Sequence, residues 1–340
     1  MSTFKVGLTR DLLTASGQPS FGAAPLQILA AAKDDLQWEY IPESVPEITP
    51  DQAARYDAIY VNSPKVTAAS VSRSDCRLQL VARHGVGYDS VDVAAMTRAG
   101  ILLTNTPMAI RRPVAIMAIT YVLALAQRML IKDRLTRSGN WNQRNEHMGR
   151  GLTGRTLGIV GAGGTGQEML RLVRGFDMRL LAADPYADAA RVEALGAKLV
   201  PLPTLLREAD FVVLMCLLND ETRHLIDADA LALMKSTAYL VNVARGPVVD
   251  ERALIEALHA KRIAGAGLDV FEQEPVAPDN PLLKMEHVIV SPHALCWTDE
   301  CFNAIATDGL TSVVDVARRR RPVHLVNPDA LNAPRWAHLR

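Results

Sequence analysis

The sequence predicts an α/β protein with two Rossmann-like, doubly wound domains. Short apolar runs alternate with longer amphipathic segments along most of the chain, a pattern typical of βαβ units and parallel sheets. The chain has 340 residues, which is too long for one ordinary domain and suits two. A glycine-rich turn near the middle of the chain directly follows an apolar run and precedes a helical pattern.

The first series of elements begins near the amino terminus. We expect strands at residues 4–8, 58–61, 78–82 and 100–104, after which "NTP" at Asn105–Pro107 closes the last strand. Pro113 is expected at the first position of a helix, where its missing N–H has no cost. The apolar stretch 114–126 is predicted to be a buried helix, and the polar stretch after it a long connection that carries Trp141.

A second series of elements begins at Thr156. Six strands are expected, at residues 156–160, 179–184, 209–216, 238–244, 263–270 and 287–290. The closing segment 298–319 has a helical period, and we expect it to return to the first domain. The prediction is therefore a discontinuous, flavodoxin-like first domain (1–106 and 296–340) around a continuous second domain (107–295).

Composition limits the possible partners. The 37 basic and 37 acidic side chains cancel, which argues against a nucleic acid or an anionic membrane and for a small molecule. The four cysteines show no C-x-x-C pair or zinc-binding spacing, so we expect no metal and reduced thiols in the cytoplasm. We find no signal peptide and no stretch of about 18 apolar residues, so no membrane span is expected.

The turn "GAGGTG" predicts a dinucleotide site. Gly161, Gly163 and Gly166 have G-x-G-x-x-G spacing, with Gly164 and Thr165 inside the motif. Such a turn lets backbone approach a diphosphate at a helix N-terminus. Asp184 follows the next strand, where a carboxylate can accept hydrogen bonds from a ribose 2′-hydroxyl and repel a 2′-phosphate, so NAD is favoured over NADP. The alternative is a structural turn that binds no nucleotide.

Polar residues follow the last three predicted strands. Arg245, Asp269 and Glu274, and His293 come after successive strands, and ligands bind outside the carboxyl ends of such strands. We therefore expect these groups to converge at the edge that holds the glycine loop. Taken one by one, each has a structural alternative: an exposed cation, a solvated acid or a core histidine.

At this point the chain resembles the D-isomer-specific 2-hydroxyacid dehydrogenases over nearly its whole length. The resemblance implies NAD as cofactor, a homodimer, and Arg245, Glu274 and His293 as catalytic residues. It also implies that the backbone N–H groups of Val86 and Gly87 hold the substrate carboxylate, and that Asp269 lies beside the nicotinamide. The motifs that carry it are "RHGVGYDSVDV" (83–93), "NTP", "TLGIVGAGGTG" with Asp184, "LVNVARGPVVDE" (240–251), "GLDVFEQEP" (267–275) and "VSPH" (290–293).

The chemistry agrees with these roles. Arg245 suits a cation that orients a 2-keto acid and stabilises oxyanion charge, and is thus also a substrate ligand. His293 suits a proton donor in reduction and acceptor in oxidation. A carboxylate at hydrogen-bond distance, Glu274, favours a protonated imidazole. The function we expect is NAD-dependent interconversion of a small D-2-hydroxy acid and its 2-keto acid.

Several alternatives stay open on sequence alone. Within the family, the alternatives are D-3-phosphoglycerate dehydrogenase and glyoxylate/hydroxypyruvate reductase. An alternative from a different class is a non-catalytic, NAD-sensing protein that resembles a corepressor. Trp297 either lines the substrate site or packs a domain junction. Arg111 and Arg112 either face an acidic group of the substrate or are solvated.

Overall fold

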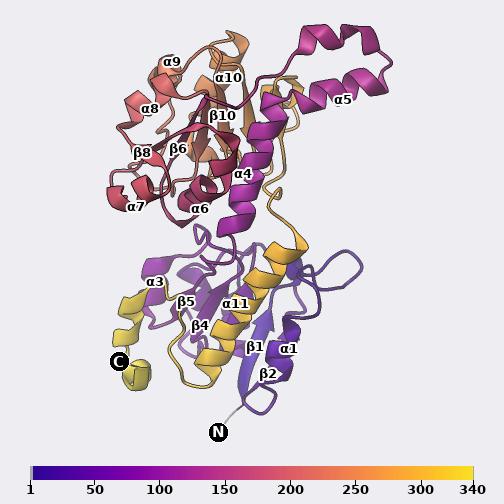
Figure 1. Ribbon diagram of the computed structural model, residues 1–340. Helices are drawn as coiled ribbons and strands as arrows, with labels where there is room; N and C mark the ends of the chain where they lie inside the picture. Colours follow the sequence, from indigo (N-terminus) through magenta and orange to yellow (C-terminus); the bar gives the residue numbers. More distant parts are fainter. Residues whose placement is uncertain (1–2, 340) are drawn as a thin grey trace. The chain divides into compact units, whose positions relative to one another are not determined.

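The computed structural model describes residues 3–339, which divide into two compact units, each built on a parallel sheet (Figure 1). The first unit joins the chain up to Ile110 with the segment from Trp297 onward, and the second is Arg111–Cys296. Both are Rossmann-like α/β units, which confirms the predicted fold class.

The sheet of the first unit has five strands in the order β2-β1-β3-β4-β5, all parallel. This order is flavodoxin-like. The sequence analysis missed β2, although "LQWEY" alternates apolar and polar residues as a half-exposed strand does. It is an edge strand in which only Leu36 is buried. The strands are β1 (Phe4–Leu8), β2 (Leu36–Tyr40), β3 (Ala58–Val61), β4 (Leu80–Arg83) and β5 (Leu102–Thr104).

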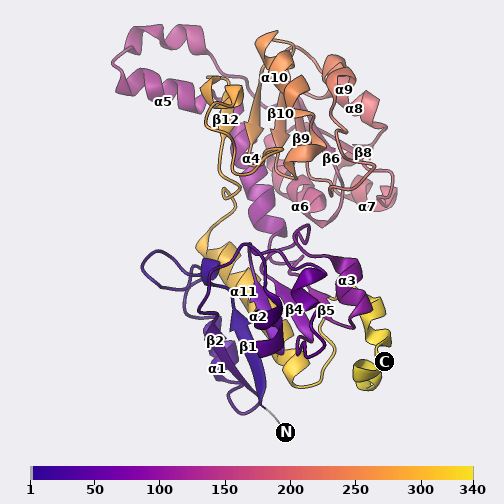
Figure 2. The same ribbon diagram turned by 180° about the vertical axis from the view of Figure 1, so that it is seen from behind.

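Helices cover both faces of this sheet, as Figure 2 also shows. α1 (Leu26–Ala30) and α11 (Asp299–Ala317) pack on one face, and α2 (Pro50–Arg55) and α3 (Val93–Arg98) on the other. The predicted closing helix is thus confirmed as α11, whose N-cap Thr298 accepts the N–H of Cys301. The unit also contains short 3-10 helices: η1 (Arg10–Leu12), η2 (Ala69–Val71), η7 (Pro328–Asn332) and η8 (Pro334–Leu339).

The sheet of the second unit has seven parallel strands in the order β12-β11-β10-β9-β6-β7-β8. Counted within the unit this is the Rossmann order, with the switch point between β6 and β9. Six of these strands are the predicted ones; the short β8 was missed. The strands are β6 (Thr156–Val160), β7 (Arg179–Ala183), β8 (Ala197–Leu199), β9 (Phe211–Leu214), β10 (Tyr239–Asn242), β11 (Gly265–Leu268) and β12 (Val288–Val290).

The helices of this unit include one long buried segment, α4 (Arg111–Ala126), which packs along α6 and against β10 and β11. Pro113 is its third residue rather than its first, a correction with little consequence because N–H groups of the first turn have no helical acceptor. The other helices are α6 (Gly164–Leu172), α7 (Ala189–Ala194), α8 (Leu202–Glu208), α9 (Ala228–Leu233), α10 (Glu251–His259), η4 (Val173–Phe176), η5 (Gly246–Val248) and η6 (Pro281–Lys284).

Residues 129–148 form an arm that extends away from the rest of the second unit (Figure 1). The arm contains α5 (Met129–Arg137) and the 3-10 helix η3 (Trp141–His147), and neither has a buried residue. Among residues 3–339, no single helix is long and apolar enough to cross a membrane, whereas α4 and α5, bent by 58°, pass that test as a pair.

Candidate active site

The glycine loop connects β6 to α6. Gly161 has φ of +96°, and a Cβ there would lie 2.5 Å from the backbone N of Cys216. A Cβ on Gly166 would lie 2.2 Å from the carbonyl oxygen of Gly161, so helix and strand approach closely only without side chains. Gly163 is the N-cap of α6 and has open space on its Cβ side. The loop thus leaves the helix N-terminus open to a ligand.

Asp184 lies directly after β7 and is tied to this loop. Its Oδ2 accepts the N–H of Ala162 at 2.8 Å, and its Oδ1 accepts the N–H of Tyr186 at 2.9 Å. A carboxylate has about four acceptor sites, so each oxygen retains capacity for a further donor. Both the loop and Asp184 line a cavity of about 830 Å³ with an apolar wall that includes Val200, Leu202, Leu217 and Leu225.

These features fit an adenine dinucleotide. The apolar cavity suits a base, Asp184 suits a ribose hydroxyl, and the uncapped start of α6 suits the diphosphate. Gly161, Gly163 and Asp184, which the sequence predicts as parts of one dinucleotide site, line the same cavity. Gly164, Thr165 and Gly166 form the first turn of α6. No group of three or more His, Cys, Asp or Glu among residues 3–339 could hold a metal ion.

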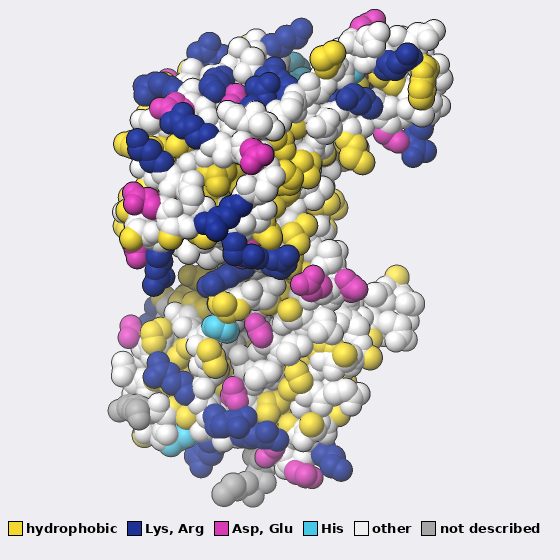
Figure 3. Space-filling view, viewed as in Figure 1, with side chains coloured by type: hydrophobic (Ala, Val, Ile, Leu, Met, Phe, Trp, Pro, Cys, Tyr) yellow, Lys and Arg dark blue, Asp and Glu magenta, His cyan; other side chains and the backbone are white. Residues whose placement is uncertain are grey.

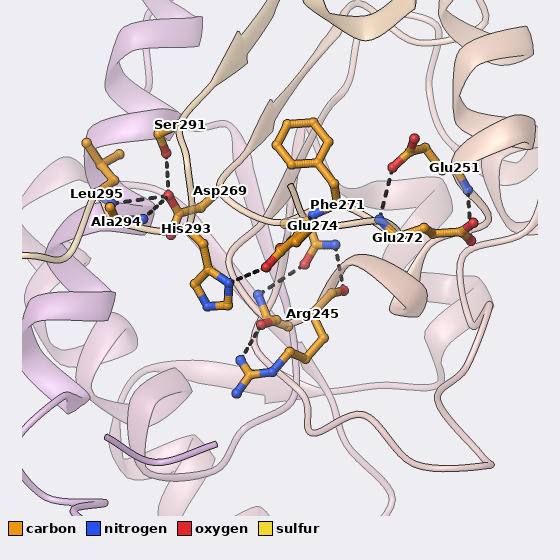
Figure 4. Close-up of polar contacts among 12 residues, drawn as sticks. Arg245, Glu251, Asp269, Phe271, Glu272, Glu274, Ser291, His293, Ala294 and Leu295 are labelled. Atoms are coloured by element: carbon orange, nitrogen blue, oxygen red, sulfur yellow. Dashed lines mark hydrogen bonds and ion pairs between the residues drawn. The ribbon is translucent and has the colours of Figure 1, made fainter. Parts of the chain in front are cut away.

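The predicted catalytic residues gather after β10, β11 and β12 (Figure 4). His293 Nδ1 lies 2.8 Å from Glu274 Oε2, while Glu274 Oε1 accepts the N–H of Phe271 at 3.0 Å. Arg245 follows β10 in an extended conformation, and its Nη1 donates to the carbonyl of Ala244 at 2.7 Å. Parallel strands end at one sheet edge, which is why three distant segments meet here.

The neighbours of Glu274 change its pKa. Burial raises the pKa of Glu274, but the hydrogen bonds from His293 and the Phe271 N–H, together with the charges of His293 and Arg245, outweigh burial and lower it overall. Glu274 is therefore a carboxylate in the neutral pH range.

Asp269 is the support of the segment that carries His293. It is 2% exposed, and its Oδ1 accepts the N–H groups of Ala294 and Leu295, each at 3.1 Å, and the hydroxyl of Ser291. Its carbonyl accepts the N–H of His293 at 2.8 Å. These bonds fix the turn from Ser291 to Leu295, in which His293 has φ of 55°. The resemblance implies only a place beside the nicotinamide for Asp269; what the structure shows is that Asp269 holds this turn.

Sequence reasoning missed two residues that complete this support. Ser291 donates to Asp269 and is paired with the hydroxyl of Tyr121 on α4. Burial raises the pKa of Tyr121, so its hydroxyl stays protonated. The sequence does mark both residues: Ser291 lies in the motif "VSPH", and Tyr121 is a polar group within an otherwise apolar stretch. Tyr121 meets Ser291 because α4 packs against β11, the strand paired with β12, and Ser291 directly follows β12.

The predicted substrate ligands Val86 and Gly87 lie in the first unit, in the loop after β4. Asn105 Nδ2 donates to the carbonyl of Val86 at 2.9 Å, and Gly85 accepts the N–H of Thr106 at 3.0 Å, so "NTP" supports this loop. Trp297, also in the first unit, packs edge-to-face on Phe302 with ring centroids 5.0 Å apart and stays 57% exposed.

Comparison with known proteins agrees with this geometry. A family model described as "D-isomer specific 2-hydroxyacid dehydrogenase, NAD binding domain" matches residues 119–294. A glyoxylate reductase of Korarchaeum cryptofilum is 42% identical over 266 residues, 77% of this chain and 80% of that protein. A D-3-phosphoglycerate dehydrogenase of Archaeoglobus fulgidus is 38% identical over 249 residues, 73% of this chain and 47% of that protein.

Solved structures give the same result for the whole chain. A glyoxylate reductase from Paecilomyes thermophila superposes with a TM-score of 0.83 at 28% identity, covering 96% of this chain and 99% of that one. D-lactate dehydrogenase from Escherichia coli gives 0.79 at 26% identity, covering 95% and 100%. The chain therefore belongs to the D-isomer-specific 2-hydroxyacid dehydrogenases and is an NAD-dependent oxidoreductase of 2-hydroxy and 2-keto acids.

Proposed function

We propose that this enzyme reduces glyoxylate, or a 2-keto acid of similar size, with His293 as the proton donor. The observation that carries the proposal is the 2.8 Å pair between His293 Nδ1 and Glu274 Oε2. Relatives named glyoxylate reductase, 38% to 46% identical, support the choice of keto acid.

In this proposal the two ring nitrogens of His293 have separate tasks. Glu274 holds Nδ1 and stabilises the protonated ring, so Nε2 gives its proton to the substrate oxygen. Arg245 donates to the carbonyl and the carboxylate of the keto acid and stabilises the developing oxyanion. NADH supplies the hydride when it is bound. In the reverse direction His293 accepts the proton.

The remaining roles complete the site. Val86 and Gly87 offer backbone N–H groups to the substrate carboxylate, and the loop after β4 that holds them is fixed by Asn105. Gly161, Gly163, Gly164, Thr165 and Gly166 cradle the diphosphate, and Asp184 accepts the ribose hydroxyls. Asp269 positions the His293 turn and lies beside the nicotinamide.

Phosphoglycerate dehydrogenase activity is the second candidate, favoured by the Archaeoglobus relative. The test is NADH oxidation with glyoxylate, hydroxypyruvate, pyruvate and phosphohydroxypyruvate, ranked by kcat/KM. We expect glyoxylate or hydroxypyruvate to rank first. A preference for phosphohydroxypyruvate of about tenfold or more would overturn the choice of substrate, and no turnover despite tight NADH binding would favour the sensor alternative.

We also propose a homodimer that works in the cytoplasm without a nucleic-acid or membrane partner. The arm supports the dimer, because Met129, Leu130, Trp141 and Met148 are 45% to 79% exposed there. Hydrophobic side chains are visible on this arm in Figure 3, at the upper right. Exposed apolar groups gathered on one projecting segment are typical of an interface.

The proposed cytoplasmic location is tested by cell fractionation, in which we expect the enzyme in the cytoplasmic fraction.

A further inference from the structure

Arg111 lies on the glycine loop. It is the first residue of α4, and α4 packs along α6. A Cβ built on Gly164 would lie 2.4 Å from Arg111 Nε and 2.6 Å from Cζ. The guanidinium therefore covers the backbone of the first residue of α6. Any side chain at position 164 would compete with it for the same space.

The adjacent arginine behaves differently. Arg112 Nη1 pairs with Glu168 of α6 at 3.0 Å, so its charge is compensated by the protein. The side chain of Arg111 makes no ion pair or hydrogen bond with another group among residues 3–339. It is half-buried against the loop rather than extended into solvent.

This position is unfavourable for a cation unless an anion is present. α4 begins at Arg111 and α6 begins at Gly164, so the guanidinium lies where two helices start. Helix N-termini carry partial positive charge, so each disfavours a nearby cation. The two helix N-termini and the guanidinium together place positive charge at the glycine loop, where a helix N-terminus can bind an anion.

We propose that Arg111 is a ligand of the dinucleotide diphosphate, reaching the glycine loop from α4. Its planar fork suits phosphate oxygens, and it would supplement the backbone N–H groups of the loop with a full charge. Gly164 is then required because its lack of a side chain admits the guanidinium. The proposal rests on NAD(H) binding and not on the choice of keto acid.

The test measures NADH binding without substrate, by isothermal titration calorimetry of the full-length protein. We expect Arg111→Ala to raise the Kd of NADH about tenfold, the usual loss for one charge-assisted hydrogen bond. Arg112→Ala is the matched control and should stay within about twofold, because Glu168 already pairs with Arg112. ADP-ribose should respond as NADH does, whereas adenosine, which lacks phosphate, should bind both variants equally.

A second pair of variants tests the role of Gly164. Gly164→Ala places a methyl group where the guanidinium lies and should weaken NADH binding by a similar factor. If both act through the same contact, the double variant Gly164→Ala/Arg111→Ala should bind within about twofold of the single ones rather than show the product of their effects. Arg111→Lys should retain part of the affinity, and it replaces Arg111→Ala if that variant fails to fold.

Two results would overturn the proposal. One is an unchanged Kd of NADH in both Arg111→Ala and Arg111→Lys. The other is a raised KM for phosphohydroxypyruvate with an unchanged Kd of NADH, which would place Arg111 at the substrate instead. Because NADH binding is measured without a keto acid, either result stands apart from the substrate ranking.

Discussion

His293 adopts φ of 55°, a left-handed conformation that residues with a side chain seldom take. Such a backbone costs of the order of 1 kcal/mol or more and persists only where neighbours enforce it. Asp269 holds this conformation, because its carboxylate and its carbonyl accept backbone N–H groups of the turn. The strained turn aims the imidazole at Glu274, so buried hydrogen bonds set the geometry of an exposed ring.

Replacing this imidazole tests the proposed proton transfer. We expect His293→Gln to lower kcat at least a hundredfold or so, because an acid–base group contributes about 10²–10⁴ to a rate. The Kd of NADH should stay the same. His224→Gln is the control, since His224 also pairs with a glutamate in this unit, Glu272, at 2.7 Å. A kcat for His293→Gln close to that of the control would contradict the role.

The packing of α11 on the sheet of the first unit buries another histidine, His84. His84 follows β4, is 4% exposed and contacts Tyr60, Phe21 and Phe302, which come from β3, the loop before α1 and α11. Its Nδ1 is hydrogen-bonded to the Tyr60 hydroxyl, and its Nε2 has no protein partner. Burial, with a smaller effect of the Arg83 charge, lowers the pKa of His84 to about 3.

This packing predicts a pH dependence of stability. Between about pH 6.5 and pH 3 the unfolded chain binds a proton at His84 that the folded chain does not, so the free energy of unfolding falls as pH falls. From pH 7 to pH 5 we expect a loss of about 2 kcal/mol that His84→Gln does not show. The same substitution at exposed His259 is the control.

Urea unfolding at the two pH values measures this difference. Trp38, Trp297 and Trp336 lie in the same unit as His84, so tryptophan fluorescence mainly reports on that unit. If the free energy of unfolding depends on pH equally in the wild type and in His84→Gln, His84 binds its proton as readily in the folded as in the unfolded chain, and the prediction is wrong.

At the scale of the whole molecule, the arm predicts assembly. The double variant Trp141→Glu/Met148→Glu places charges on side chains that are 61% and 79% exposed. We expect light scattering to give twice 37.0 kDa for the wild type and a monomer for the variant, since buried unpaired charges are costly.

Val323→Glu, on an 81% exposed residue of the first unit, is the control and should leave the mass unchanged. A dimer that survives both arm substitutions would place the interface elsewhere.

The sequence alone determined the strand–helix alternation, the glycine loop with Asp184, and the location of Arg245, Glu274 and His293 after successive strands. These features are local, because hydrophobic periodicity, turn residues and strand ends depend on residues that are adjacent in the sequence. Parallel strands then bring their ends to one edge. The sequence analysis missed the edge strand β2 and the short β8. β8 has only three residues, which is too short for a period to be recognised, whereas β2 shows a strand's alternation that the analysis did not use.

Only the tertiary structure decided what holds these residues in place. The support of the His293 turn by Asp269, Ser291 and Tyr121 spans 170 positions of the chain at its longest bond. Arg111 reaches Gly164 because α4 packs along α6, although neither residue's neighbours in sequence suggest it. Contacts between distant segments depend on how layers pack, and that is set by the folded core rather than by any local pattern.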